Sequence, residues 1–240
     1  MYFYSKKKDR IVKIFFFVLF VELIGEVLLD FLNFPYLVYS FKPLLMPILI
    51  YWYKKSKSDY LNILVYALSF SFLGDVFLMF LPVSEHFFLA GLASFLITHL
   101  LYLIVFVKYI NNKEKSIFWK KPHLSLPFIL YGFSLVAYLT QMENPKFIEM
   151  KIPVIVYASV IMLMVLSAIG RYNKVNQKSF SLVLIGALLF MFSDTLIALN
   201  NFSNIFDSNK YVARILIMIL YSFGQFLIVK GIIEQKIKKC

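Results

Sequence analysis

The sequence predicts an all-α membrane protein, a bundle of eight transmembrane helices with both termini in the cytoplasm. Of the 240 residues, 61% are hydrophobic and only 16% are charged, whereas a soluble domain averages about 45 to 50% apolar and about 25% charged residues. The apolar residues fall into eight runs of roughly the length that crosses the hydrocarbon core of a bilayer. Lysine and arginine gather between alternate runs, which is the pattern that orients membrane helices.

The eight runs follow one another along the whole chain, which we treat as one integral-membrane domain of residues 1–240. A helix needs about 20 apolar residues, with a range of about 17 to 25, to cross a bilayer. The runs cover residues 11–29, 37–53, 60–81, 86–107, 124–140, 152–170, 180–200 and 211–233. The first run follows a basic segment, as a signal peptide does, but it is long and leads into no small-residue cleavage site, so we expect a mature helix.

The basic residues indicate how the helices are oriented. Of the 25 lysines and arginines, 20 lie in the amino-terminal segment, in the carboxy-terminal tail and in the connectors after the second, fourth and sixth runs. The positive-inside rule places these segments in the cytoplasm, which requires an even number of spans. The net charge of +12 therefore reflects topology and attraction to the lipid bilayer, and we expect no nucleic-acid partner.

A few polar side chains fall inside the apolar runs, and each is a candidate functional residue. An ionisable group at the centre of a membrane helix costs about 2.5 to 3.5 kcal/mol on insertion scales. The ionisable candidates are Glu22, Glu26, Lys42, Asp75, His99 and Asp194, and the uncharged polar neighbours are Tyr102, Ser193, Tyr221 and Gln225. The fifth and sixth runs carry no charge in their interiors, so we expect them to serve as scaffold.

Asp75 and Asp194 are the strongest of these candidates. Each lies six residues before the outer end of its predicted span, which corresponds to a depth of about 9 Å at about 1.5 Å per helical residue. Neither has a basic neighbour in sequence, and each follows a small residue, Gly74 or Ser193, that admits another helix or a substrate. We expect the polar groups to converge on a pocket in the outer half of the membrane.

Structural interpretations of the other candidates stay open. Lys42 is either a substrate contact or a lysine whose ammonium reaches the membrane surface while its stem stays buried. Glu22 and Glu26 are either site carboxylates or structural partners of Lys42. His99, and likewise the two tyrosines and the glutamine, are alternatively hydrogen bonders between helices.

The sequence also limits the chemistry. A zinc site needs three or four His, Cys, Asp or Glu ligands, yet only one histidine lies in the interior of a span and the single cysteine, Cys240, is the last residue. We therefore expect no zinc, although a carboxylate site for magnesium or calcium stays open. No Gly-x-Ser-x-Gly motif is present for a serine nucleophile. Acid–base catalysis and ion coupling are therefore the two roles left for the polar residues inside the spans.

An ordered set of short motifs then connects the chain with a known family. The motifs are Lys42-Pro43, Gly74-Asp75, His99-x-x-Tyr102, Ser193-Asp194 and Tyr221-x-x-x-Gln225. In order and spacing this set resembles the YhhN family of eight-span membrane proteins. The resemblance runs from about residue 42 to residue 225 and leaves out the first span, so Glu22 and Glu26 inherit no role from it.

The resemblance implies a lysoplasmalogenase, an enzyme that hydrolyses the vinyl ether bond of a lysoplasmalogen to a fatty aldehyde and glycerophosphoethanolamine or glycerophosphocholine. Asp75 and Asp194 are then the acid and the base or cation stabiliser, with their individual roles open, as in the carboxyl pairs of glycosidases. Lys42 contacts the substrate phosphate. The remaining candidates orient the carboxylates, the water or the intermediate: His99, Tyr102, Ser193, Tyr221 and Gln225.

This interpretation calls for a lysophospholipid substrate, no metal and no cofactor, and we expect the protein in a bacterial cytoplasmic (inner) membrane. The alternative is a proton- or cation-coupled transporter, or a lipid-binding membrane protein, that uses the same aspartates. Broken helices at the site would favour the alternative, and only Pro43 and Gly74 are candidate breaks.

Overall fold

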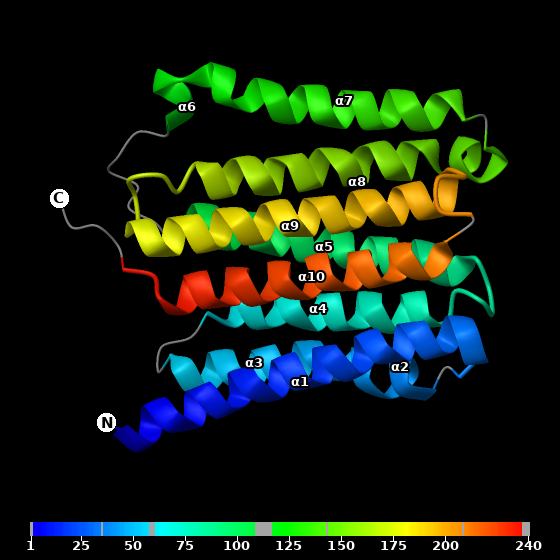
Figure 1. Ribbon diagram of the computed structural model, residues 1–240. Helices are drawn as coiled ribbons and strands as arrows, with labels where there is room; N and C mark the ends of the chain where they lie inside the picture. Colours follow the sequence, from blue (N-terminus) through cyan, green and yellow to red (C-terminus); the bar gives the residue numbers. More distant parts are fainter. Residues whose placement is uncertain are drawn as a thin grey trace. The chain divides into compact units, whose positions relative to one another are not determined.

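The computed structural model describes residues 2–34, 36–57, 61–108, 117–142, 144–207 and 209–236, and every regular element in these ranges is a helix (Figure 1). The predicted all-α class is therefore confirmed. The chain forms two compact units, Met1–Leu101 and Tyr102–Cys240, which meet within helix α5 (His86–Lys108). Some basic residues used to predict the orientation, such as Lys113 and Lys238, lie outside the described residues, as does Cys240.

The first unit contains the helices of the first four predicted spans. They are α1 (Tyr2–Leu32), α2 (Tyr36–Phe41), the 3-10 turn η1 (Lys42–Leu44), α3 (Leu45–Ser56), α4 (Asn62–Met79) and the first part of α5. The predicted run 37–53 is thus divided at Pro43, whose ring lacks the backbone N–H that a continuous helix needs. Phe41 and Leu44 keep right-handed helical dihedral angles, so the chain tightens there without unwinding.

The second unit holds the last part of α5 and the helices of the last four predicted spans. They are α6 (Ile117–Lys120), the 3-10 turn η2 (Pro122–Ser125), α7 (Leu126–Gln141), α8 (Pro145–Ile169), α9 (Gln177–Phe202) and α10 (Lys210–Ile233). Helix α8 begins seven residues before the predicted run 152–170. Asn144 caps it by accepting a 2.9 Å hydrogen bond from the backbone N–H of Lys146, and Pro145 occupies the first turn.

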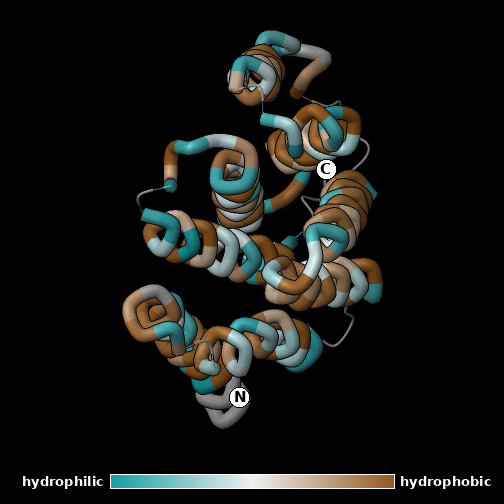
Figure 2. The backbone as a smooth tube through the Cα atoms, turned by 90° about the vertical axis from the view of Figure 1, so that its right-hand side faces the viewer, coloured by the Kyte–Doolittle hydropathy of each residue, from teal (hydrophilic) through white to brown (hydrophobic). Residues whose placement is uncertain are grey.

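Six helices in the described part of the chain are long and apolar enough to cross a membrane, namely Asn62–Met79, His86–Lys108, Pro122–Gln141, Pro145–Ile169, Gln177–Phe202 and Lys210–Ile233. Hydrophobic positions predominate along the helical turns drawn in Figure 2. The chain is therefore an integral membrane protein. Helix α1 is long enough as well, but its apolar stretch includes Lys13, Glu22 and Glu26, and the second predicted span is divided between α2 and α3. The count of eight spans stays a prediction.

Small residues bring α4 and α5 together in the first unit. A Cβ atom added to Gly74 would lie 2.7 Å from the ring of Phe95, so the ring fills the space beside this glycine. The hydroxyl of Ser71 donates to that of Thr98 at 3.2 Å, and Thr98 contacts the carbonyl of Ala67. The small residue before Asp75 therefore admits a neighbouring helix, which is one of the two roles expected for it.

Helices α9 and α10 are in backbone contact in the second unit (Figure 1). A Cβ atom on Gly186 would lie 2.7 Å from the carbonyl oxygen of Gly224, and a Cβ atom on Gly224 would lie 2.9 Å from that of Gly186. Two serine hydroxyls of α9 donate across the same interface, Ser179 to Gly231 O at 2.7 Å and Ser193 to Ile217 O at 3.1 Å. Small residues with cross-helix hydrogen bonds are the usual means of joining helices in lipid, where no hydrophobic force drives them together.

We expect Gly186→Ala to destabilise the protein by about 1 to 3 kcal/mol, because the added methyl group meets backbone atoms that cannot move independently. The measurement is thermal unfolding in detergent. Gly132→Ala on α7 is the matched control, since its added methyl group meets only the flexible thioether end of Met162. A loss of stability in Gly132→Ala as large as that in Gly186→Ala would contradict this explanation of the interface.

Candidate functional site

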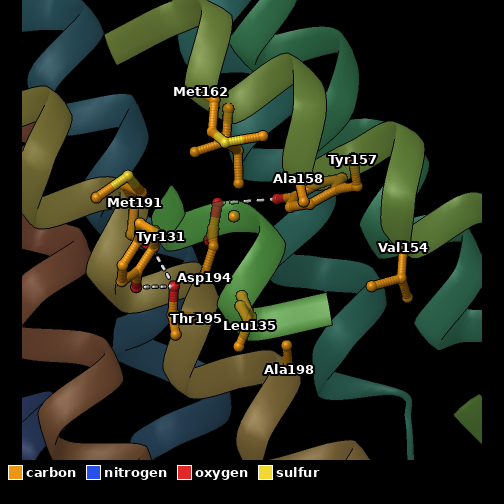
Figure 3. A pocket seen from close by; sticks show the side chains of 12 residues that line it. Tyr131, Leu135, Val154, Tyr157, Ala158, Met162, Met191, Asp194, Thr195 and Ala198 are labelled. Carbon is orange, nitrogen blue, oxygen red and sulfur yellow. Dashed lines mark hydrogen bonds between the residues drawn. The ribbon is translucent and has the colours of Figure 1, made fainter. Parts of the chain in front are cut away.

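Asp194 lies on α9 and is joined to α8 by a hydrogen bond. Its side chain is 5% exposed, and the Tyr157 hydroxyl donates to its Oδ2 at 2.9 Å (Figure 3). Helix α8 packs along α9, which brings residues 37 positions apart into contact. A hydrogen bond to an ionised group is stronger than one between neutral groups, so Tyr157 both orients the carboxyl and stabilises negative charge on it.

Asp194 forms part of the wall of a partly open apolar pocket between α7, α8 and α9, with a cavity volume of about 40 Å³. The pocket is lined by Tyr131, Gly132, Leu135, Val154, Tyr157, Ala158, Ile161, Met162, Met191, Asp194, Thr195 and Ala198. A cavity of this kind, mostly apolar with a few polar groups that fix orientation, is typical of sites for small molecules and lipid chains.

A second polar pair lies in the same wall. The hydroxyls of Tyr131 on α7 and Thr195 on α9 are 2.7 Å apart, and the Thr195 hydroxyl also contacts the carbonyl of Met191 at 2.9 Å. Because the single hydroxyl proton of Thr195 goes to that carbonyl, Tyr131 must be the donor to Thr195. This bond connects α7 to α9 beside the pocket.

The sequence analysis missed Tyr131, Tyr157 and Thr195. It treated the fifth and sixth runs as scaffold because they carry no charge, yet these runs supply much of the pocket wall and the partner of Asp194. The sixth run therefore contributes a polar contact to the candidate site, and its role as scaffold stays a prediction. The sequence holds 16 tyrosines, and a hydrogen bond across helices leaves no local signal that distinguishes one tyrosine from the others.

Three of the predicted polar neighbours gather in one aromatic cluster of the second unit. The buried Tyr102 hydroxyl on α5 donates a hydrogen bond to Gln225 Oε1 on α10. The rings of Tyr102 and Tyr221 both pack edge-on against Phe190, with ring centroids 6.3 and 5.4 Å apart. None of Tyr102, Tyr221 and Gln225 is among the residues that line the pocket. These contacts are the helix-to-helix arrangement that we kept as the alternative for them.

Ser193 also contributes to helix packing. Its hydroxyl is bonded to the carbonyl of Ile217 on α10, and Ser193 is not among the residues of the pocket wall. The small residue that precedes Asp194 therefore admits α10.

The remaining candidates lie in the first unit. Glu22 and Glu26 on α1, Asp75 on α4 and His99 on α5 are buried, whereas Lys42 in η1 is half-buried. Glu22 interacts electrostatically with Lys42, Glu26 and Asp75, so four of the predicted residues do gather within this unit.

Asp75 and Asp194 belong to different units, and their convergence on one pocket stays a prediction. Within the described ranges, no group of three or more His, Cys, Asp or Glu side chains has an arrangement that fits a metal ion.

Arg171 is an unexpected buried charge in the turn between α8 and α9. Its side chain is fully buried, its Nη2 donates to Ser179 Oγ at 3.0 Å and to Gln235 Oε1 at 3.1 Å, and its guanidinium lies 5.6 Å from the ring centre of Phe106. Burial lowers the pKa of Arg171 to about 10, so the side chain stays charged at neutral pH. This residue, which the sequence analysis counted only as a marker of topology, connects the ends of α9 and α10.

The fold and the site together define a class, a helical integral membrane protein with a carboxyl group in the wall of an apolar pocket. Within that class, the chain belongs to the YhhN family, whose model matches residues 37–232. The predicted family is thus confirmed, and Glu22 and Glu26 lie before the matched residues. Searches of curated proteins and of solved structures gave no match to this chain.

We expect Tyr102 and Gln225 to be coupled energetically, because removing either one leaves the other as a buried polar group without this partner. A double-mutant cycle with Tyr102→Phe and Gln225→Leu, followed by unfolding in detergent, should give a coupling free energy of about 0.6 to 1.7 kcal/mol. Strictly additive effects would show that this contact does not stabilise the pairing of α5 with α10.

Proposed function

We propose that the chain is an intramembrane hydrolase of the lysoplasmalogenase type, which cleaves the vinyl ether bond of a lysoplasmalogen. The products are a fatty aldehyde and glycerophosphoethanolamine or glycerophosphocholine. The observation that carries this proposal is the hydrogen bond from Tyr157 to Asp194 in the wall of an apolar pocket. Membership of the YhhN family supports the same function.

The pocket suits the two parts of such a substrate. An apolar chain gains roughly 0.8 kcal/mol for each buried CH₂ group, and the wall between α7, α8 and α9 offers leucine, isoleucine and methionine side chains for this contact. The carboxyl group of Asp194 interrupts this apolar wall, and a vinyl ether is the polar group at the base of the chain in a lysoplasmalogen. A chain lying in the pocket therefore brings its reactive group to the carboxyl group in the wall.

We assign Asp194 the role of cation stabiliser and base, because the hydrogen bond from Tyr157 stabilises its ionised form. Asp75 is the candidate acid. The acid donates a proton to the β-carbon of the vinyl ether, whose π electrons form the new C–H bond and leave an oxocarbenium ion. Water adds to the cationic carbon and transfers a proton to Asp194. The resulting hemiacetal loses its hydroxyl proton to the acid, and its bond to the glycerol oxygen breaks. That oxygen takes the proton from Asp194, which restores both carboxyl groups.

We also propose that the chain crosses a bacterial cytoplasmic membrane eight times, with both termini in the cytoplasm. Lys42 then contacts the phosphate of a lysophospholipid, and the reaction needs no metal and no cofactor. Chelators are expected to leave the activity unchanged.

The direct test incubates the purified protein with lysoplasmenylethanolamine and measures aldehyde release. We expect Asp194→Asn and Asp75→Asn each to lower kcat by about 10² to 10⁴, the range typical of acid–base groups. Tyr157→Phe should lower it by about 10- to 10²-fold, since one charge-assisted hydrogen bond is worth about 1.5 to 3 kcal/mol. The matched control is Tyr66→Phe, which changes a tyrosine of α4 that is 58% exposed.

Full activity in a folded Asp194→Asn variant would overturn the assignment of the site. Movement of a proton or a lipid across liposomes without aldehyde release would instead support the transporter alternative. The Tyr66→Phe variant shows whether the loss of a tyrosine hydroxyl in a span is by itself harmful.

A further inference from the structure

Glu22 on α1 is a buried carboxyl group that the proposed hydrolysis does not use. It is fully buried, and in the described part of the chain neither of its carboxylate oxygens has a hydrogen-bond partner. A buried polar group without a partner costs about 1 to 3 kcal/mol, and more if it is charged. The residue also lies before the part of the chain that matches the family. The burial of Glu22 therefore needs an explanation that neither the proposed hydrolysis nor the family match supplies.

Glycine packing brings the basic residue Lys42 toward Glu22. A Cβ atom on Gly25, one helical turn after Glu22, would lie 2.9 Å from Leu37 Cβ and 3.1 Å from the backbone nitrogen of Val38. Helix α2 thus lies directly against the face of α1 that carries Glu22 and Glu26, and η1 follows α2 at once. Of the charges that act on Glu22, that of Lys42 has the largest effect, ahead of Glu26 and Asp75.

The side chains of Glu22 and Lys42 interact electrostatically without forming an ion pair. Within the described residues, no ion pair joins Lys42 to Glu22, although each is close enough to feel the field of the other. Lys42 is half-buried, whereas Glu22 and Glu26 are buried. The group therefore places the ammonium of Lys42 at one end and the carboxyl groups of the two glutamates at the other. Within the described residues, no group of three or more His, Cys, Asp or Glu side chains has an arrangement that fits a metal ion.

We propose that Glu22, Glu26 and Lys42 bind the zwitterionic headgroup of a lysophospholipid, with its ammonium group at the two glutamates and its phosphate at Lys42. The substrate class rests on the proposed function, whereas the choice of headgroup rests on this cluster. A primary ammonium donates charge-assisted hydrogen bonds to carboxylates, and these bonds would satisfy the oxygens of Glu22. A trimethylammonium group has no N–H to donate, so the site prefers ethanolamine to choline.

The test measures binding of lysolipids that contain no vinyl ether, so it does not depend on hydrolysis. The full chain in detergent is titrated with lysophosphatidylethanolamine, lysophosphatidylcholine and lysophosphatidylglycerol of equal chain length, and bound lipid is counted by native mass spectrometry. The wild type should bind the ethanolamine lipid most tightly. Glu22→Gln should weaken its binding about tenfold, equivalent to about 1.4 kcal/mol, and change binding of the glycerol lipid by less than about twofold.

Glu26→Gln provides a second test of the ammonium contact, and Lys42→Gln tests the phosphate contact by weakening all three lipids alike. The matched control is Glu149→Gln, which changes an exposed acid of α8 and should affect none of them. Thermal unfolding establishes that each variant is folded. Equal weakening of the ethanolamine and glycerol lipids in Glu22→Gln, or no weakening in both glutamate variants, would overturn the proposal.

The two proposals fail separately. A preference for ethanolamine that depends on Glu22, without any aldehyde release from lysoplasmalogen, would leave the headgroup site intact and remove the hydrolase. Aldehyde release that depends on Asp194, with no difference in binding between headgroups, would support the hydrolase and overturn the headgroup site.

Discussion

A carboxyl group inside a membrane protein must find a partner, and the hydrogen bond between Tyr157 and Asp194 meets this requirement. The bond needs α8 and α9 side by side, with both side chains turned toward α7. The polar pair of Tyr131 and Thr195 then connects α7 to α9 beside the same space. The pocket is therefore formed by three helices whose polar contacts converge near one aspartate, and it is otherwise apolar.

The rigid interface of α9 with α10 supports this arrangement. Backbone contact at Gly186 and Gly224 and the serine hydrogen bonds fix the face of α9 that packs on α10. Asp194 directly follows Ser193, so fixing one residue on α10 turns the next toward α8 and the pocket. In the first unit, by contrast, Glu22 is buried and has no hydrogen-bond partner among the described residues. One buried acid is held in place by a hydrogen bond, and the other is the group that we propose to bind a headgroup.

Much of the fold could be predicted from the sequence, because long apolar runs in a membrane protein have few alternatives to helix. The predicted runs correspond to the observed helices, with differences at Pro43, where the missing N–H tightens the helix, and at Asn144, whose cap starts α8 among charged residues. The site could be predicted only in part. Charged residues such as Asp194 and Glu22 were evident from their cost in lipid. Tyr157 was not, since its role depends on which helix packs against α9 and which of its faces points inward.

The central claim is that the pocket beside Asp194 binds the hydrocarbon chain of a lysolipid. Its most direct measurement is photolabelling with a lysophospholipid that carries a diazirine near the base of its chain, followed by mass spectrometry of the labelled peptides. The account predicts labels on pocket residues such as Leu135, Met162 and Met191, and their loss when unlabelled lysolipid competes. Labels confined to lipid-exposed side chains such as Phe133 and Ile152, with the pocket residues unlabelled, would contradict it.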